Sequence, residues 1–303
     1  MTNISIIIPY YKGKEYIYEC FHAIENSYNK SNKILTLEII LVLDSFEEKD
    51  ELKRVLPEKF KNLKIRIVSN NENIGVAKSR NKGLELAESE FVVFLDQDDL
   101  FLENYFQVVE SIIKQNVDIF ILNGYIRQIK TNDKQSIFHI RPSFTFKHLL
   151  KKWTNILSPG LLIFRKSILP KNLFLDTSEE YKGCDDWSAY LSLTSRGRLK
   201  SKFMNEKVFV YNIHESNYSH DQKHMRQAAI HALKHLRKDS EITKRSYQKL
   251  IVRHIKIREL KYRIQFEKST IVKEFLKSPI IVFHLILNIS FLFNKHISIL
   301  KKK

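Results

Sequence analysis

Residues 91–99 read Phe-Val-Val-Phe-Leu-Asp-Gln-Asp-Asp, a pattern that indicates the class of fold. Its five apolar residues favour a strand that is covered on both faces, as in a parallel sheet flanked by helices. Three carboxylates follow that strand at once. Because ligands of open parallel sheets bind outside the carboxyl ends of the strands, we expect a binding site at this acidic run.

The acidic run also indicates the chemistry of the site. Asp96, Asp98 and Asp99 repel one another, which is unfavourable without a cation nearby. Mg²⁺ and Mn²⁺ prefer carboxylate oxygens and usually keep coordination positions open for phosphate. The alternative is that the acids cap the next helix, whose N-terminus favours Asp. Capping explains one Asp but not three within four residues, so the run predicts a divalent metal site.

Outward from this stretch, short apolar runs alternate with helical patterns. Strict alternation over the first ~120 residues predicts βαβ units and a mainly parallel sheet flanked by helices. Beyond residue 125 the pattern is less regular. The expected strands are 4–8, 37–43, 65–68, 91–95, 119–122, 161–164 and 208–211, and the expected helices are 15–27, 50–56, 76–87, 103–115 and 186–194.

The composition is that of a chain able to bury a core. Apolar residues make up 43% of the 303 residues, which excludes global disorder and low complexity. Cys20 and Cys184 are too few for a disulfide framework or a zinc-finger set, so we expect buried or idle thiols in a reducing compartment. We expect no secretory signal at residues 1–9 and no membrane-spanning helix, since no stretch reaches ~18 uninterrupted apolar residues.

Positive charge is concentrated toward the carboxyl end of the chain. The net charge is +17, of which residues 223–303 carry +15 and the first 222 residues carry +2. Residues 222–276 show a long basic helical pattern, and an amphipathic pattern follows over 280–300. We therefore predict a basic helical extension of 222–303, which points to a polyanionic partner such as an anionic membrane surface or nucleic acid.

Two further stretches place polar residues at the same edge of the predicted sheet. Residues 73–83 read Asn-Ile-Gly-Val-Ala-Lys-Ser-Arg-Asn-Lys-Gly. Gly75 allows a tight turn before a helix, and Arg80 offers a planar fork suited to a diphosphate. The first expected strand ends at Pro9, which cannot continue a ladder interior, and Tyr11 follows in the loop.

Taken together and in this order, these motifs resemble the family 2 glycosyltransferases, which have the GT-A fold. That family opens with a strand ending in Pro and Tyr, as at Pro9 and Tyr11. A second strand of the family ends in a paired Asp followed by Gly-Ser, of which this chain keeps the second acid as Asp44. Residues 73–83 match the family's Asn-x-Gly-x-x-x-x-Arg-Asn-x-Gly stretch. Residues 96–99 match the DxDD form of its DXD motif.

The resemblance covers residues 3–220 and implies an α/β catalytic domain of GT-A type. Its expected bounds are 1–221, with a nucleotide-sugar half at 1–125 and an acceptor half at 126–221. The implied activity is metal-dependent, inverting transfer of a sugar from a nucleoside-diphosphate sugar to a hydroxyl of a glycan or lipid-linked glycan. The implied setting is bacterial surface-polysaccharide synthesis. UDP is the nucleotide expected from the family, with GDP and dTDP as alternatives.

The resemblance also assigns roles in the donor half. Asp44 is expected to contact the base, Arg80 the phosphates and Asp96 the ribose, while Asp98 is expected to bind Mn²⁺ or Mg²⁺. The full set of implied nucleotide-sugar contacts is Pro9, Tyr11, Asp44, Asn73, Gly75, Arg80, Asp96 and Gln97.

In the acceptor half, the pair Asp185-Asp186 resembles the family's Glu-Asp motif, in which the second acid is the general base. Both are implied as catalytic residues. His214 resembles a histidine that approaches the metal or the diphosphate, although a lone His is also often structural. The acceptor contacts expected here are Trp153, Gly160 and Trp187, and the alternative for a tryptophan is packing in a core.

Other classes of function fit the sequence less well. A non-catalytic nucleotide-sugar binder and a nucleotidyltransferase on a related fold remain alternatives. Nucleic-acid binding through the extension leaves the acidic run unexplained, because carboxylates repel phosphate backbones, so we expect no nucleic-acid partner. The extension suits an anionic membrane surface, or packing on the body or on a second subunit. We therefore expect a cytoplasmic enzyme, peripheral at the inner face of the bacterial cell membrane.

Overall fold

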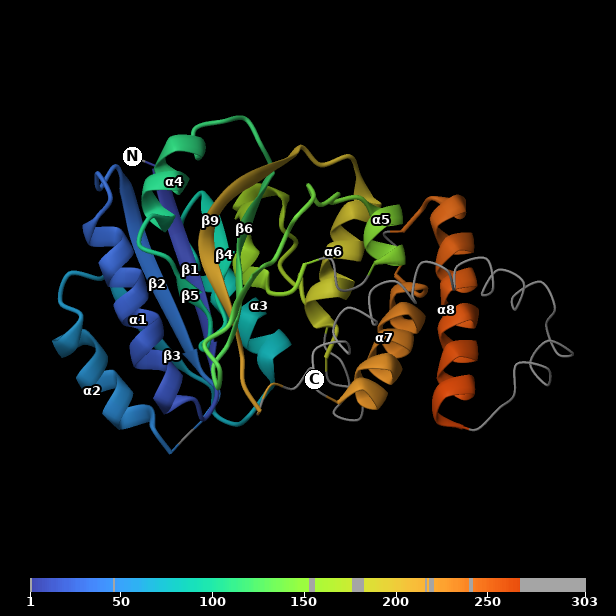
Figure 1. Cartoon of the computed structure of the whole chain (residues 1–303), viewed down its shortest axis with the longest axis horizontal. Coiled ribbons are helices and arrows are strands. Elements are labelled where there is room, and N and C mark those ends of the chain that lie inside the picture. The colour runs from blue at the N-terminus through green and yellow to red at the C-terminus, as the bar shows by residue number, and fades with distance from the viewer. Residues whose placement is uncertain are drawn as a thin grey trace, which may run out of the picture. The chain divides into compact units, whose positions relative to one another are not determined.

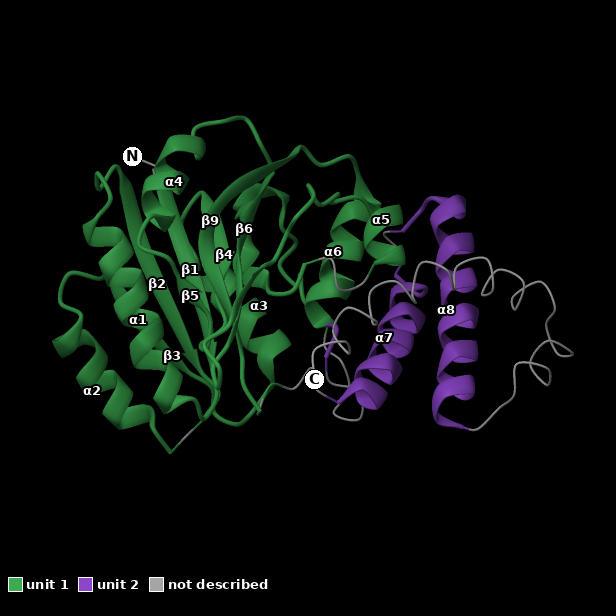
Figure 2. Cartoon of the chain, viewed as in Figure 1, with its two compact units in different colours: residues 1–177, 185–220 green, residues 178–184, 221–303 purple. Residues whose placement is uncertain are grey.

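The computed structural model describes residues 2–45, 47–152, 156–175, 183–215, 217, 221–239 and 242–267. The chain divides into two compact units, which Figure 2 shows in separate colours. The first comprises residues 1–177 and 185–220, and the second comprises residues 178–184 and 221–303. Every described strand belongs to the first unit.

A mixed sheet runs through the first unit (Figure 1). Its strands are β1 (Thr2–Tyr10), β2 (Leu35–Leu43), β3 (Ile65–Ser69), β4 (Phe91–Phe94), β5 (Leu100–Phe101), β6 (Ile119–Gln128), β7 (Lys134–Ser136), β8 (Leu162–Arg165) and β9 (Ser201–Ile213). They lie in the order β3-β2-β1-β4-β8-β6-β9-β5, and β7 pairs with β6. The strands β1 to β4 are parallel, as predicted. In contrast, β8 is antiparallel to β4 and β6, and β5 is antiparallel to β9.

This topology gathers strand ends at one edge of the sheet. The carboxyl ends of β1 to β4 meet there because these strands are parallel. Since β8 is antiparallel to both β4 and β6, β6 runs in the direction of β4, and β9 is parallel to β6. The segment after Ile213 at the end of β9 therefore reaches the same edge as the acidic run after Phe94 at the end of β4.

Helices follow most of the strands along the chain, and those after β1, β2, β3 and β5 pack on the sheet (Figure 1). They are α1 (Lys14–Asn29), α2 (Lys49–Lys59), α3 (Val76–Leu86), α4 (Tyr105–Ile112), α5 (Phe146–Lys151) and α6 (Asp185–Arg196), with short 3₁₀ turns at Pro159–Leu161 and Lys166–Ile168. α1 buries Ile17, Cys20, Phe21 and Ile24, whose spacing marks one helix face. All four residues of β4 are buried, which confirms a strand covered on both faces. Cys20 and Cys184 are buried thiols that form no disulfide, as expected.

The structure differs from the sequence-based expectation in several short elements. β5 has two residues, β7 reads Lys-Gln-Ser and α5 has six residues, so none carries a periodic apolar pattern long enough to recognise. β1 also continues through Pro9 to Tyr10 rather than ending at the proline. The proline is tolerated because β4 pairs only with residues 4–7 of β1, so its missing N–H interrupts no bond on that side.

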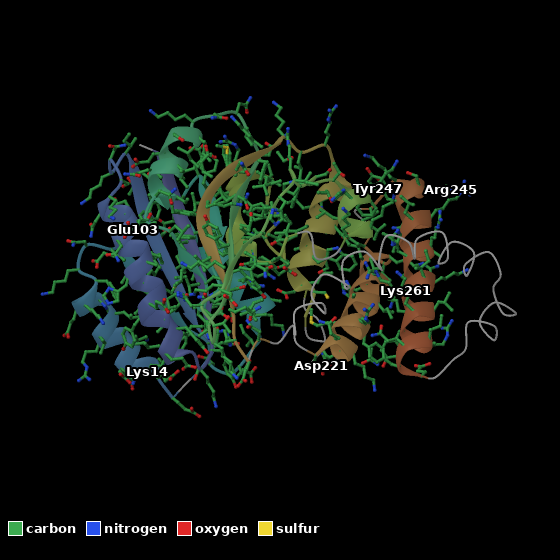
Figure 3. The ribbon with its side chains drawn as sticks, viewed as in Figure 1. Lys14, Glu103, Asp221, Arg245, Tyr247 and Lys261 are labelled. Atoms are coloured by element: carbon green, nitrogen blue, oxygen red, sulfur yellow. The ribbon has the colours of Figure 1, made fainter. Side chains whose placement is uncertain are left out.

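The second unit contains α7 (Gln222–Leu236) and α8 (Arg245–Phe266), which pack on each other. Figure 3 labels Asp221 before α7 and Arg245 at the start of α8. The Asp221 side chain caps α7 by accepting a hydrogen bond of 2.9 Å from the backbone N–H of His224.

The basic helical region expected over 222–276 consists of two helices where the structure describes it. The sequence between them includes Asp-Ser-Glu-Ile-Thr at 239–243, whose short polar side chains compete for backbone hydrogen bonds. Within the described ranges, no helix is both long and apolar enough to cross a membrane. The amphipathic pattern over 280–300 lies outside the described residues.

Gly124 is required where β6 approaches β9 at an irregularity in their register. A Cβ atom added there would lie 2.1 Å from the carbonyl oxygen of Phe209, which is backbone and cannot turn away. We expect Gly124→Ala to lower the free energy of unfolding by about 1–3 kcal/mol, measured by urea denaturation. Gly197→Ala is the control, because a Cβ at Gly197 meets no atom within 4 Å. Equal denaturation midpoints for the two variants would contradict this prediction.

Candidate active site

Asp99, the last residue of the acidic run after β4, is held by hydrogen bonds from other parts of the chain. This carboxylate is buried and accepts hydrogen bonds from the Ser158 hydroxyl (2.6 Å) and the Asn212 backbone N–H (3.2 Å). Burial and the charges of Asp98 and Asp96 raise the pKa of Asp99 well above its usual range. Asp99 is therefore a structural acid that fastens the run to β9 and to the loop before β8.

Gln97 fastens the same run to the end of β1. Its side-chain carbonyl accepts a hydrogen bond from the Tyr11 backbone N–H (2.8 Å), and its amide donates to the Tyr11 carbonyl (3.1 Å). The Tyr11 side chain itself is exposed. The predicted donor residues Gln97 and Tyr11 thus lie together at the carboxyl edge.

Asp98 lies against His214, which follows β9. The distance between Asp98 Oδ2 and His214 Nε2 is 2.8 Å, across 116 residues of sequence. Tyr16 of α1 stacks on the His214 ring, with centroids 4.6 Å apart and planes 22° apart. The Asn212 amide also donates to the Asp98 carbonyl (2.5 Å). Asp98 and His214 are among the residues predicted from the sequence, whereas Tyr16 and Asn212 are not, because neither residue type nor spacing indicates this role.

The donor set of this pair fits a divalent cation that shares its coordination with a substrate. Among the described residues, no group of three or more His, Cys, Asp or Glu side chains is arranged to hold a metal alone. Mg²⁺ sites that take substrate phosphates use only one or two protein carboxylates. Asp98 and His214 would supply a carboxylate oxygen and an imidazole nitrogen, which leaves the remaining positions for phosphate oxygens.

Arg80 of α3 joins the two acidic motifs of the sequence. Its guanidinium is buried, donates to Asp185 Oδ2 (2.6 Å) and forms an ion pair with Asp96. It also lies 5.2 Å from the centroid of the Phe174 ring. Both terminal nitrogens of the guanidinium therefore contact carboxylates. The expected contact of Arg80 with phosphates stays a prediction.

Asp44 shapes the loop that leads into α3. Its Oδ1 accepts hydrogen bonds from the Asn70 amide and the Ile74 backbone N–H, and its Oδ2 accepts from the Gly75 backbone N–H, each at 2.8 Å. Asn73 Oδ1 accepts from the same Gly75 N–H at 3.1 Å. Gly75 has a φ of 83°, a conformation that glycine adopts without strain. The structure therefore gives Asp44 and Asn73 a role in loop geometry, and their expected contacts with the nucleotide stay predictions.

Asp186 stands at the start of α6, beside the ion pair of Asp185 with Arg80. Burial, together with the charge of Asp185, raises the pKa of Asp186 to about 7. Its Oδ1 accepts a hydrogen bond of 2.6 Å from the backbone N–H of Trp187. A half-buried carboxylate with a pKa near neutrality is suited to accept a proton at physiological pH.

The three expected acceptor residues have different outcomes. The Trp187 indole is buried and donates a hydrogen bond of 2.8 Å to the Leu149 carbonyl, so the structure favours its role in packing α6 on α5. Gly160 is buried as well, and a Cβ there would lie 2.5 Å from the Phe209 ring. Trp153 lies outside the described residues.

The mixed sheet, with an acidic run at its carboxyl edge that Arg80 links to the pair Asp185-Asp186, has the form expected of the GT-A fold. The sequence pattern of glycosyl transferase family 2 matches residues 5–173, and the chain belongs to this family. The structure resembles the crystal structure of S. aureus TarS 1-349 in complex with UDP-GlcNAc, with a TM-score of 0.62, 18% identity, and coverage of 88% of this chain and 74% of that one. At that identity the likeness shows the fold.

Two curated relatives are each 27% identical to this chain. One is the minor teichoic acid biosynthesis protein GgaB of Bacillus subtilis (strain 168), aligned over 72% of this chain. This chain covers 24% of GgaB, about a quarter of its length. The other is the UDP-Glc:alpha-D-GlcNAc-diphosphoundecaprenol beta-1,3-glucosyltransferase WfaP of Escherichia coli, aligned over 72% of this chain and 80% of WfaP.

Proposed function

We propose that this glycosyltransferase moves a hexosyl or N-acetylhexosaminyl group from a UDP-sugar to a hydroxyl of a glycan or lipid-linked glycan in bacterial surface-polysaccharide synthesis. The observation that carries the proposal is that Arg80 joins two acidic motifs at one sheet edge. It pairs with Asp96 of the acidic run and with Asp185, which precedes Asp186. The same run places Asp98 beside His214. The relatives add support, because the names of GgaB and WfaP refer to teichoic acid and to a diphosphoundecaprenol-linked acceptor.

The residues divide the work of such a transfer between donor and acceptor. Asp98 and His214 would hold Mn²⁺ or Mg²⁺, and the bound cation would neutralise charge on the leaving nucleoside diphosphate. Asp186 accepts the proton of the acceptor hydroxyl while that oxygen forms a bond to the anomeric carbon. The bond from the anomeric carbon to the diphosphate oxygen breaks in the same displacement, so the configuration inverts. Arg80 neutralises Asp185 and thereby leaves Asp186 as the carboxylate available for the proton.

The donor half of the proposal is tested by calorimetry of UDP binding with and without Mn²⁺. We expect Asp98→Ala to weaken metal-dependent binding by about tenfold or more, since the metal loses one of two protein ligands. Asp133→Ala is the matched control, because Asp133 is exposed in the turn before β7. Tight UDP binding that needs no metal and is unchanged in Asp98→Ala would remove Asp98 from this role. If the folded chain binds no nucleoside diphosphate, the donor assignment is wrong.

A further inference from the structure

A row of basic side chains on α8 takes no part in the proposed transfer reaction. It consists of Arg245, Lys249, Arg253 and Lys256, which we call the α8 basic row. Successive members are four, four and three residues apart, the spacing that places side chains on one face of a helix. All four are exposed. Ile251 and Ile255 of the same helix are buried on a different face, so α8 presents the row to solvent.

Among the described residues, no acidic side chain compensates the charge of the α8 basic row. Residues 242–258 contain six Lys or Arg and no Asp or Glu. Where the structure describes the chain, none of the four row residues makes an ion pair, and the nearby Glu259 pairs with Lys234 of α7 at 2.7 Å. Four positive charges therefore follow one another along about 16 Å of helix. Such a concentration of like charge is unfavourable by itself and favours an extended anionic partner.

We infer that the α8 basic row docks the second unit on a bilayer surface that contains anionic lipid headgroups. A straight, exposed row of bases matches a flat sheet of negative headgroups without needing a groove. No large aromatic side chain of α8 is exposed, whereas single-stranded nucleic acids are bound by bases stacking on aromatic rings. The sequence 278–294 contains no Asp, Glu, Lys or Arg, and its apolar character suits a lipid interface better than a phosphate backbone.

The inference is tested by sedimentation of the full chain with vesicles, in the absence of any sugar nucleotide or acceptor. One set of vesicles is phosphatidylcholine alone, and the other contains about a third phosphatidylglycerol. The variant Arg245→Gln/Lys249→Gln/Arg253→Gln/Lys256→Gln removes the row. The control variant Lys53→Gln/Arg54→Gln/Lys61→Gln/Lys64→Gln removes the same charge from exposed positions of the first unit.

We expect the wild-type chain to prefer anionic over neutral vesicles by about tenfold or more in 0.1 M salt, with the preference falling as salt rises. The row variant should lose most of that preference, and the control variant should keep it. The measured quantity is the ratio of the chain's affinity for anionic vesicles to its affinity for neutral vesicles. Any apolar contribution to binding is common to both vesicle types and cancels in this ratio. Circular dichroism verifies that each variant keeps its helices, and Arg245→Gln/Lys249→Gln replaces the fourfold variant if that one does not fold.

Three results would overturn the inference. The first is an unchanged preference in the row variant. The second is an equal loss in the control variant, which would mean that net charge and not the α8 basic row is recognised. The third is displacement of the wild-type chain from anionic vesicles by duplex DNA at equal phosphate concentration, which would favour a nucleic-acid partner. The vesicle experiment does not depend on sugar transfer. A negative result would therefore leave the proposed reaction unaffected, and a failure of the proposed reaction would leave the vesicle result unaffected.

Discussion

Asp186→Asn is expected to lower kcat by about 10³-fold or more, with little change in UDP binding. The amide has nearly the shape of the carboxylate but cannot accept the proton of the acceptor hydroxyl. UDP binding should persist because Asp98 and His214 contact each other, and Tyr16 stacks on His214, without involving Asp186. Initial rates with a UDP-sugar and a lipid-linked acceptor measure the loss, and calorimetry with UDP measures the binding. Retention of a tenth of the wild-type rate would remove Asp186 from the role of base.

The same residue predicts the pH dependence of the wild-type enzyme. Burial first, and then the charge of Asp185, raises the pKa of Asp186 to about 7. A general base must be deprotonated, so the rate should be low at pH 5.5, rise through about pH 7 and level off above pH 8. Asp133→Asn, which alters an exposed acid outside the site, should leave this profile unchanged. A rate independent of pH over this range would show that the titrating group is not the base of the rate-limiting step.

Arg80→Met should abolish transfer and also destabilise the first unit. The change removes the positive charge between Asp96 and Asp185 while keeping a long apolar side chain in the buried position. Removing the arginine leaves two carboxylates without a counter-charge, and one of them, Asp96, is partly exposed. We therefore expect the free energy of unfolding to fall by about 3 kcal/mol. Urea denaturation at pH 8 measures the loss of stability, and initial rates measure the loss of transfer.

The controls for Arg80 separate charge from geometry. Arg80→Lys keeps the charge but not the planar fork that spans two carboxylates, so it should recover part of the stability and little of the activity. Arg54→Met removes an exposed arginine of α2 and should leave both quantities close to wild type. A denaturation midpoint for Arg80→Met equal to that of the wild type would contradict the view that this residue joins the two motifs.

Local periodicity made much of the first half predictable. The alternation of apolar runs with helical patterns located β1 to β4 and the helices between them, because a buried parallel strand and an amphipathic helix each leave a period in the sequence. The acidic run was also recognisable in the sequence, because three carboxylates after a buried strand repel one another unless a cation lies nearby. The short elements β5, β7 and α5 left no such period and were missed.

Local sequence patterns were thus enough to predict the class of fold, the edge of the sheet at which the acidic residues lie and the residue types available there. The pairing of these residues is visible only in the folded chain: Arg80 meets Asp185 across 105 residues, and Asp98 meets His214 across 116. Those pairings depend on where β9 enters the sheet and on the placement of α6, which no local pattern specifies. The physical reason is that periodicity reports which face of an element is buried, whereas the choice of partner across the chain is set by packing of the whole sheet and its helices.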